Sequence, residues 1–127
     1  MTLDDSRAAE PGPSDDARRR ARQLDETLPD IDWTVPPRGA VRGWVDAPSG
    51  RIATLSQGDP AAPLVLLVPG VTGSKEDFAL MLPLLADAGF RAVSYDMAGQ
   101  YESRDAGPEH LRPPRPNYDH DLFVGDL

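Results

Sequence analysis

The chain has 127 residues, of which 39% are hydrophobic and 14 are prolines, so it suits one small domain but cannot form a core along its whole length. Its formal net charge of -8 argues against a nucleic-acid partner, because phosphate binding needs clustered Lys and Arg. The sequence contains no Cys, which excludes disulfides and thiolate chemistry. It has neither the apolar core of a signal peptide nor a run of membrane-spanning length, so we expect a cytoplasmic protein without a membrane partner.

Residues 1–37 form a polar segment rich in Asp, Arg, Pro and Ala. Such a segment cannot bury enough apolar surface to offset the entropy lost on ordering, so a mostly disordered arm is predicted. Within it, residues 15–27 are good helix formers, and Ser14 is a candidate N-cap for a helix there. The basic run Arg18–Arg20 is flanked by acids and is interpreted as a solvated face.

Residues 38–127 form the predicted folded part, which opens with two short strands. The strands are expected at Val41–Val45 and Arg51–Ser56, on either side of the turn sequence Asp46-Ala-Pro-Ser-Gly50. Two short runs around such a turn predict an antiparallel hairpin.

A strand, helix and strand are predicted next. The apolar run Leu64–Val68 does not alternate and is too short for a helix, so it predicts a strand buried on both faces, as in a parallel sheet. The tight turn 69–74 leads into a helix with Ser74 as its N-cap and Gly89 at its end. Arg91–Tyr95 is the next predicted strand, and the whole is a βαβ unit.

The predicted helix carries apolar residues at helical spacing but also a proline. Its expected core face consists of Phe78, Met81, Leu82 and Leu85. Because Pro83 falls inside, the segment is expected to bend or to divide into two pieces. Residues 104–117 are expected to be a loop, and a further helix is expected from Tyr118.

Two motifs now stand in order: Leu64–Val68 followed by Pro69-Gly-Val-Thr-Gly-Ser74, and Tyr95-Asp-Met-Ala-Gly-Gln-Tyr-Glu-Ser103. Together they resemble the third strand, oxyanion loop, first helix and fourth strand of the α/β-hydrolases. The resemblance implies an α/β fold, namely the N-terminal part of an α/β-hydrolase sheet with an antiparallel hairpin followed by a βαβ unit. The sequence departs from the usual pattern at three positions: Pro69 replaces His, Ala98 replaces Arg and Tyr101 replaces Gly.

The resemblance implies one part of a catalytic site. The backbone N–H of Val71 matches an oxyanion-hole donor, which must point at the place where negative charge develops on the substrate. Pro69, Gly70 and Gly73 would support this loop. The alternative is an ordinary turn between strand and helix.

The second motif is expected to organise its own loop. In the family, the Asp that ends the fourth strand mainly forms local hydrogen bonds, so Asp96, Gly99 and Ser103 are assigned to loop organisation rather than to catalysis.

No catalytic residue is assigned in this chain. A Gly-x-Ser-x-Gly nucleophile motif is absent and is expected beyond Leu127, followed in chain order by a carboxylate and a His. His110 and His120 are interpreted as exposed polar residues. The resemblance implies hydrolysis of an ester, amide, epoxide or similar bond in a full-length parent, acting on a small-molecule substrate without metal or other cofactor. We expect no turnover from these 127 residues alone.

Two other readings remain open. A Rossmann-type nucleotide-binding unit has a similar strand–turn–helix–strand order, but the turn Gly70–Gly73 lacks the Gly-x-Gly-x-x-Gly spacing. A non-catalytic truncated product or interaction module is the other alternative. In a hydrolase sheet, Leu64–Val68 pairs with 92–95 on one side and with the nucleophile strand on the other. Without that second partner the strand is an open apolar edge, which predicts self-association.

Overall fold

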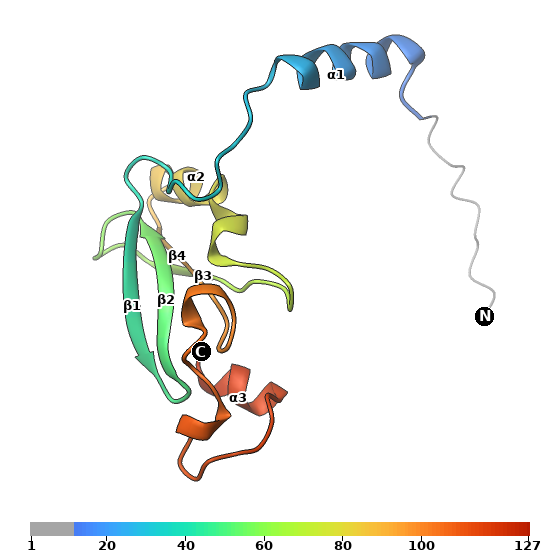
Figure 1. The fold of residues 1–127 in the computed structure, drawn as a ribbon. Helices are drawn as coiled ribbons and strands as arrows, with labels where there is room; N and C mark the ends of the chain where they lie inside the picture. The colour runs from blue at the N-terminus through green and yellow to red at the C-terminus, as the bar shows by residue number, and fades with distance from the viewer. Residues whose placement is uncertain (1–11) are drawn as a thin grey trace, which may run out of the picture. The chain divides into compact units, whose positions relative to one another are not determined.

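The computed structural model describes residues 12–127 as two compact units, one ending at Ile31 and one spanning Asp32–Leu127 (Figure 1). The first unit contains helix α1, Asp15–Thr27, and the side chain of its N-cap Ser14 accepts a hydrogen bond from the Ala17 N–H at 3.3 Å. This confirms the helix predicted inside the polar arm. No side chain of α1 is buried, as expected for its solvated basic face. Part of the predicted disordered arm, residues 1–11, lies outside the described residues.

The second unit opens with the predicted antiparallel hairpin. Strand β1, Val41–Ala47, pairs with β2, Gly50–Gln57, in a register that sets Val41 opposite Ser56. Pro48 and Ser49 make the turn, and Gly50 follows with φ +132°, a backbone conformation that favours glycine. The turn chemistry of the sequence therefore fixes the hairpin.

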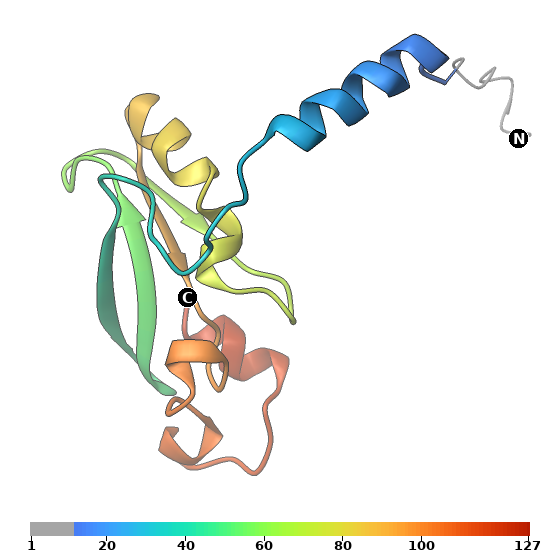
Figure 2. The ribbon, with the colours of Figure 1, turned by 45° about the horizontal axis from the view of Figure 1, so that its top comes forward.

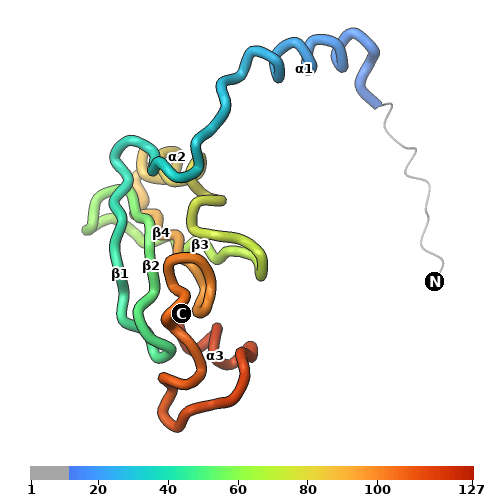
Figure 3. The backbone as a smooth tube through the Cα atoms, viewed as in Figure 1, coloured from blue at the N-terminus to red at the C-terminus, as the bar shows by residue number. Residues whose placement is uncertain are grey.

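Strands β3, Leu64–Leu67, and β4, Arg91–Tyr95, complete a four-stranded sheet in the order β1-β2-β4-β3 (Figures 1 and 3). β3 and β4 pair in parallel, with Leu64 opposite Arg91, whereas β4 and β2 are antiparallel. The parallel pair confirms the predicted βαβ unit.

The expectation that the Leu64–Val68 strand is buried on both faces is wrong for this chain. β3 is the last strand of the sheet, so one of its edges has no neighbouring strand in residues 12–127. Leu64 is 62% exposed, and Leu66 and Val68 are exposed as well. The apolar run identified the strand correctly, but its burial depends on neighbours outside the strand itself.

The crossover between β3 and β4 consists of two helical pieces, as the internal proline indicated. A 3₁₀ helix η1, Lys75–Phe78, precedes helix α2, Met81–Asp87. The division falls at Ala79 and Leu80, so Pro83 lies in the first turn of α2, where a missing N–H is tolerated. Gly89, with φ +89°, follows the end of α2.

The divided crossover changes the face that was predicted to be buried. Leu82 is fully buried and Leu85 packs beside it, but Met81 is 45% exposed, so the predicted position of Met81 in the core is wrong. Met81 is the first residue of α2, directly after the break, so the spacing of apolar residues across the whole segment did not predict its exposure.

Two small apolar clusters lie on opposite faces of the sheet, since alternate strand residues point to opposite sides. One joins α2 to the sheet through Leu55, Leu82 and Ala92. The other packs between the sheet and the chain that follows β4, which includes helix α3, His120–Gly125; Figure 2 shows the course of that chain. It consists of Ile52, Tyr95, Ala98, Ala106 and Leu122. The second cluster places the loop that begins at Asp96 firmly at the carboxyl end of β4.

Candidate functional site: two loops at the carboxyl ends of the parallel strands

The loop after β3, residues 69–74, forms a tight turn that leaves one backbone donor free. The Gly73 N–H donates to the Gly70 carbonyl oxygen at 2.9 Å, and a Cβ on Gly73 would lie 2.6 Å from an Asp77 carboxylate oxygen, so a larger residue there would displace the Asp77 side chain. Val71 is 80% exposed, and its N–H has no acceptor among residues 12–127. We call residues 69–74 the oxyanion loop, after the family motif that they resemble.

The direction of the Val71 N–H follows from the turn. The Gly70 carbonyl and the Val71 N–H belong to one planar trans peptide and therefore point in opposite directions. Since that carbonyl accepts the Gly73 N–H inside the turn, the Val71 N–H points away from it. A fixed, unpaired N–H is what an oxyanion-hole donor requires.

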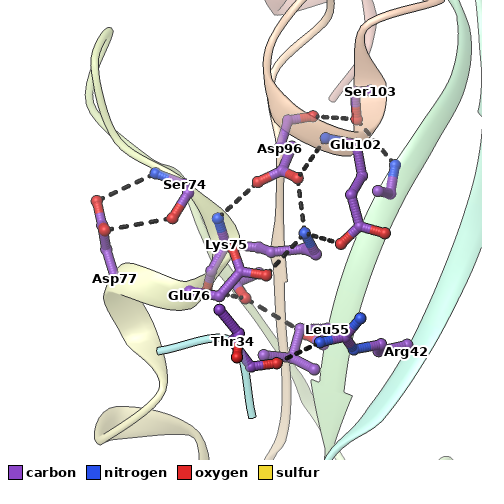
Figure 4. A network of polar contacts seen from close by, with 12 residues as sticks. Thr34, Arg42, Leu55, Ser74, Lys75, Glu76, Asp77, Asp96, Glu102 and Ser103 are labelled. Atoms are coloured by element: carbon purple, nitrogen blue, oxygen red, sulfur yellow. Dashed lines mark hydrogen bonds and ion pairs between the residues drawn. The ribbon is translucent and has the colours of Figure 1, made fainter. Parts of the chain in front are cut away.

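A buried lysine joins the start of η1 to the end of β4 (Figure 4). Lys75 is 2% exposed, and its ammonium lies within 2.9 Å of three carboxylates: Asp96 at 2.7 Å, Glu102 at 2.7 Å and Glu76 at 2.9 Å. The Lys75 backbone N–H also donates to Asp96 at 2.8 Å. The Ser94 hydroxyl donates to the Lys75 carbonyl oxygen at 2.8 Å. Lys75 is thus held through its side chain and its backbone.

The charges of this network stabilise each other. Burial alone lowers the pKa of Lys75, but the hydrogen bonds that its ammonium donates to Asp96, Glu102 and Glu76 outweigh that effect and raise the pKa above its ordinary value. The hydrogen bond from Lys75 in turn lowers the pKa of Glu102. Lys75 and Glu102 therefore stay charged at neutral pH.

The loop that follows β4, residues 96–103, is closed by its own hydrogen bonds; we call it the β4 loop. The Ser103 hydroxyl donates to the Asp96 carbonyl oxygen at 2.8 Å and accepts the Ala53 N–H at 2.9 Å. The Gly99 N–H donates to the Ser103 carbonyl oxygen at 3.0 Å. Gly99 has φ +80°, and a Cβ there would lie 2.7 Å from the Tyr118 hydroxyl. The three residues assigned to loop organisation lie together in this arrangement.

The Asp96 carboxylate is fully occupied by protein donors. One oxygen accepts the Lys75 N–H, and the other accepts the Lys75 ammonium and, at 3.3 Å, the Glu102 N–H. Asp96 is completely buried, so its carboxylate is not available as a nucleophile or as a ligand for a sugar hydroxyl.

Two side chains of the β4 loop reach the oxyanion loop. The Gln100 amide donates to the Val71 carbonyl oxygen at 2.6 Å, and the Tyr101 hydroxyl donates to the Thr72 carbonyl oxygen at 3.1 Å. No role in the site was predicted from the sequence for Lys75, Gln100, Tyr101 or Glu102. One signal was present, because Lys75 is the only lysine in a chain whose other twelve basic residues are arginines.

The turn has few free donors for a nucleotide phosphate. The N–H groups of Gly73, Ser74 and Lys75 donate to Gly70, Asp77 and Asp96, respectively. Because a Rossmann site needs such amides and a free acidic side chain after the second strand, the occupied amides and the buried Asp96 argue against that reading.

The remaining candidate catalytic side chains lie apart from this arrangement. The His110 ring contacts the Asp105 carbonyl oxygen at 3.0 Å and is exposed, and His120 is the exposed first residue of α3. Ser74 is tied to Asp77 at the start of η1. Within residues 12–127, no group of three or more His, Asp or Glu side chains is arranged to hold a metal ion.

Comparison with solved structures identifies the fold. An epoxide hydrolase from an endophytic Streptomyces is 45% identical over 56% of this chain and 20% of its own, with a TM-score of 0.50. Epoxide hydrolase A from Mycobacterium thermoresistibile is 24% identical over 68% of this chain and 25% of its own, with a TM-score of 0.57. Epoxide hydrolase VrEH1 from Vigna radiata is 21% identical over 72% and 26%, with a TM-score of 0.58. No family model and no curated protein matches the sequence.

The chain has the fold of the N-terminal part of an α/β-hydrolase, which confirms the resemblance inferred from the two motifs. It spans between 20% and 26% of the length of these three structures.

Proposed function

We propose that these residues supply the oxyanion loop of a hydrolase that cleaves an ester, amide, epoxide or similar bond of a small molecule. The observation that carries this proposal is the Val71 N–H, which is fixed by the Gly70–Gly73 turn and has no acceptor in residues 12–127. The 45% identity to a solved epoxide hydrolase supports the same class of reaction.

In the proposed mechanism, a nucleophile attacks the substrate and negative charge develops on a substrate oxygen. The Val71 N–H donates to that oxygen, and the second donor comes from the residue after the nucleophile. This chain offers the first donor and no assigned nucleophile, catalytic acid or His base. No cofactor takes part in the proposed chemistry.

The experiment compares the 127-residue chain with the native protein isolated from its own cells. We expect the native protein to hydrolyse a nitrophenyl ester or a simple epoxide, and we expect the 127-residue chain to show no turnover above buffer. Ester hydrolysis by the 127-residue chain that is lost on changing a single Ser to Ala would contradict the assignment of no catalytic residue. A native protein without hydrolase activity would contradict the proposed function.

A second candidate, an interaction module that self-associates, is favoured by the open edge of β3. Beside that edge lies a groove of about 260 Å³, lined mainly by apolar side chains on one face of the sheet. Arg91 lies at the start of the parallel strands, and Asp126 lies at their other end, beside the Ser49 turn. A second copy paired antiparallel along β3 would bring the basic end of one groove against the acidic end of the other.

Sedimentation tests this second candidate. The chain is expected to form dimers or larger species that Leu64→Lys converts to monomers, because the new charge lies on the open edge. Leu84→Lys is the matched control, since Leu84 is equally exposed but lies on α2. A wild-type chain that remains monomeric at about 100 μM, which is about 100 times the Kd of a micromolar dimer, would exclude self-association.

No helix among residues 12–127 is long and apolar enough to cross a membrane. We propose the cytoplasm as the compartment of the protein. We also propose that it binds neither nucleic acid nor a membrane, since the net charge is -8 and no run in the sequence reaches membrane-spanning length.

A further inference from the structure

Tyr101 adopts a backbone conformation that a large side chain rarely takes. Its φ of 45° is the only positive value at a non-glycine residue within residues 12–127. Bulky residues avoid this region, and such strain persists only where the surrounding structure enforces it. The conformation brings the Tyr101 hydroxyl from the β4 loop to the oxyanion loop, 29 residues earlier in the chain.

The hydrogen bond from Tyr101 begins a chain of peptides that ends at Val71. The Thr72 carbonyl, which accepts the Tyr101 hydroxyl at 3.1 Å, shares its peptide with the Gly73 N–H. That N–H donates at 2.9 Å to the Gly70 carbonyl, which shares its peptide with the Val71 N–H. Each peptide is planar and trans, so fixing its carbonyl fixes the direction of its N–H. Hydrogen bonds in such a chain also polarise one another.

We propose that Tyr101 is a positioning residue that orients and polarises the Val71 N–H through these two peptides. This inference rests on the proposed function, which assigns Val71 as an oxyanion donor. The strain at Tyr101 has a physical role in this arrangement, because it places the hydroxyl on the Thr72 carbonyl. Glycine, which is common at this position in the family, would adopt the backbone conformation easily but would lack the hydroxyl.

Gln100 provides an internal contrast. Its amide holds the Val71 carbonyl, which belongs to the peptide between Val71 and Thr72. That peptide carries the Thr72 N–H and is not part of the chain ending at the Val71 N–H. Tyr101 and Gln100 therefore hold different peptides of the same loop.

The test uses the 127-residue chain labelled with ¹⁵N-valine and ¹⁵N-glycine, at a concentration where it is monomeric. Tyr101→Phe keeps the ring and removes only the hydroxyl. We expect the Gly73 amide to exchange with solvent roughly fivefold faster, which is the factor for losing one ordinary hydrogen bond. We also expect the Val71 amide proton to shift upfield as its polarisation decreases. Tyr118→Phe is the matched control, because the Tyr118 hydroxyl donates to a backbone carbonyl, that of Ala106, outside this chain of peptides.

Unchanged Gly73 exchange and an unchanged Val71 signal in Tyr101→Phe would overturn the proposal. A second variant, Tyr101→Gly, relieves the strain and also removes the hydroxyl. It is expected to show the same faster exchange, and slow exchange in this variant would mean that backbone shape rather than the hydroxyl holds the loop. No substrate is present in either measurement, so a native protein without hydrolase activity would contradict the proposed function without changing this result.

Discussion

Replacing Lys75 by Met is predicted to destabilise the chain severely. Lys75 and Asp96 are 2% and 0% exposed, so the substitution leaves a buried carboxylate without its cationic partner. Removing one member of a buried ion pair costs about 3–5 kcal/mol, a large part of the stability of a small domain. With the urea dependence usual for small proteins, the unfolding midpoint should fall by about 1 M or more. The measurement is urea unfolding followed by circular dichroism.

The matched control is Arg115→Met, which also removes one positive charge paired with a carboxylate. Arg115 lies 3.5 Å from Asp119 on the surface, where such pairs contribute about 0–1 kcal/mol. Adding Asp96→Asn to Lys75→Met should restore part of the lost stability. The Asn side-chain oxygen can still accept the backbone N–H of residue 75, and the double variant has no unpaired charge at residue 96. An equal loss of stability in Lys75→Met and Arg115→Met would contradict the stabilising role of the buried ion pair.

Two further predictions concern the β4 loop. Because the pKa of Glu102 is lowered on folding, its contribution to stability is present above its ordinary pKa of 4.5 and is lost as the pH falls through the lower folded value. Unfolding midpoints measured from pH 6 to pH 3 should therefore fall less steeply in Glu102→Gln than in the wild type, and equal slopes would contradict this. Gly99→Ala should lower stability by about 1 kcal/mol or more, since it combines positive φ with a clash against Tyr118, whereas Gly125→Ala, with open space around its Cβ, should not. Thermal unfolding of both variants tests this, and equal midpoints would count against it.

The sequence predicted those elements whose signals are local. The hairpin follows from the turn around Ser49, and β4 has the predicted bounds Arg91–Tyr95 because a short run with Val93 and Tyr95 lies between the turn at Gly89 and Asp96. The start of α1 follows from the cap at Ser14. In each case neighbouring residues determine the conformation, so a short window of sequence is sufficient.

Other features depend on residues distant in the chain. The run Leu64–Leu67 by itself predicts a strand, whereas its position at the open edge of the sheet was predicted only from the strand order that the resemblance implies, and the structure has it there. A lysine after Ser74 reads as a surface residue until Asp96 and Glu102 fold around it. The hydroxyl of Tyr101 meets its acceptor only when two loops 29 residues apart come together. The sequence showed that Tyr101 replaces the glycine common in the family, but it did not show the hydrogen bond to the Thr72 carbonyl oxygen.

The proposed role of the Val71 N–H as an oxyanion donor is tested by the kcat values of two variants at this position. Val71→Pro in the native protein, for which we propose hydrolase activity, removes the N–H without breaking a hydrogen bond within residues 12–127, and Val71→Ala keeps it. Val71→Pro should lower kcat by a factor of about 10²–10³, whereas Val71→Ala should stay near wild type. Equal kcat values for the two variants would contradict it.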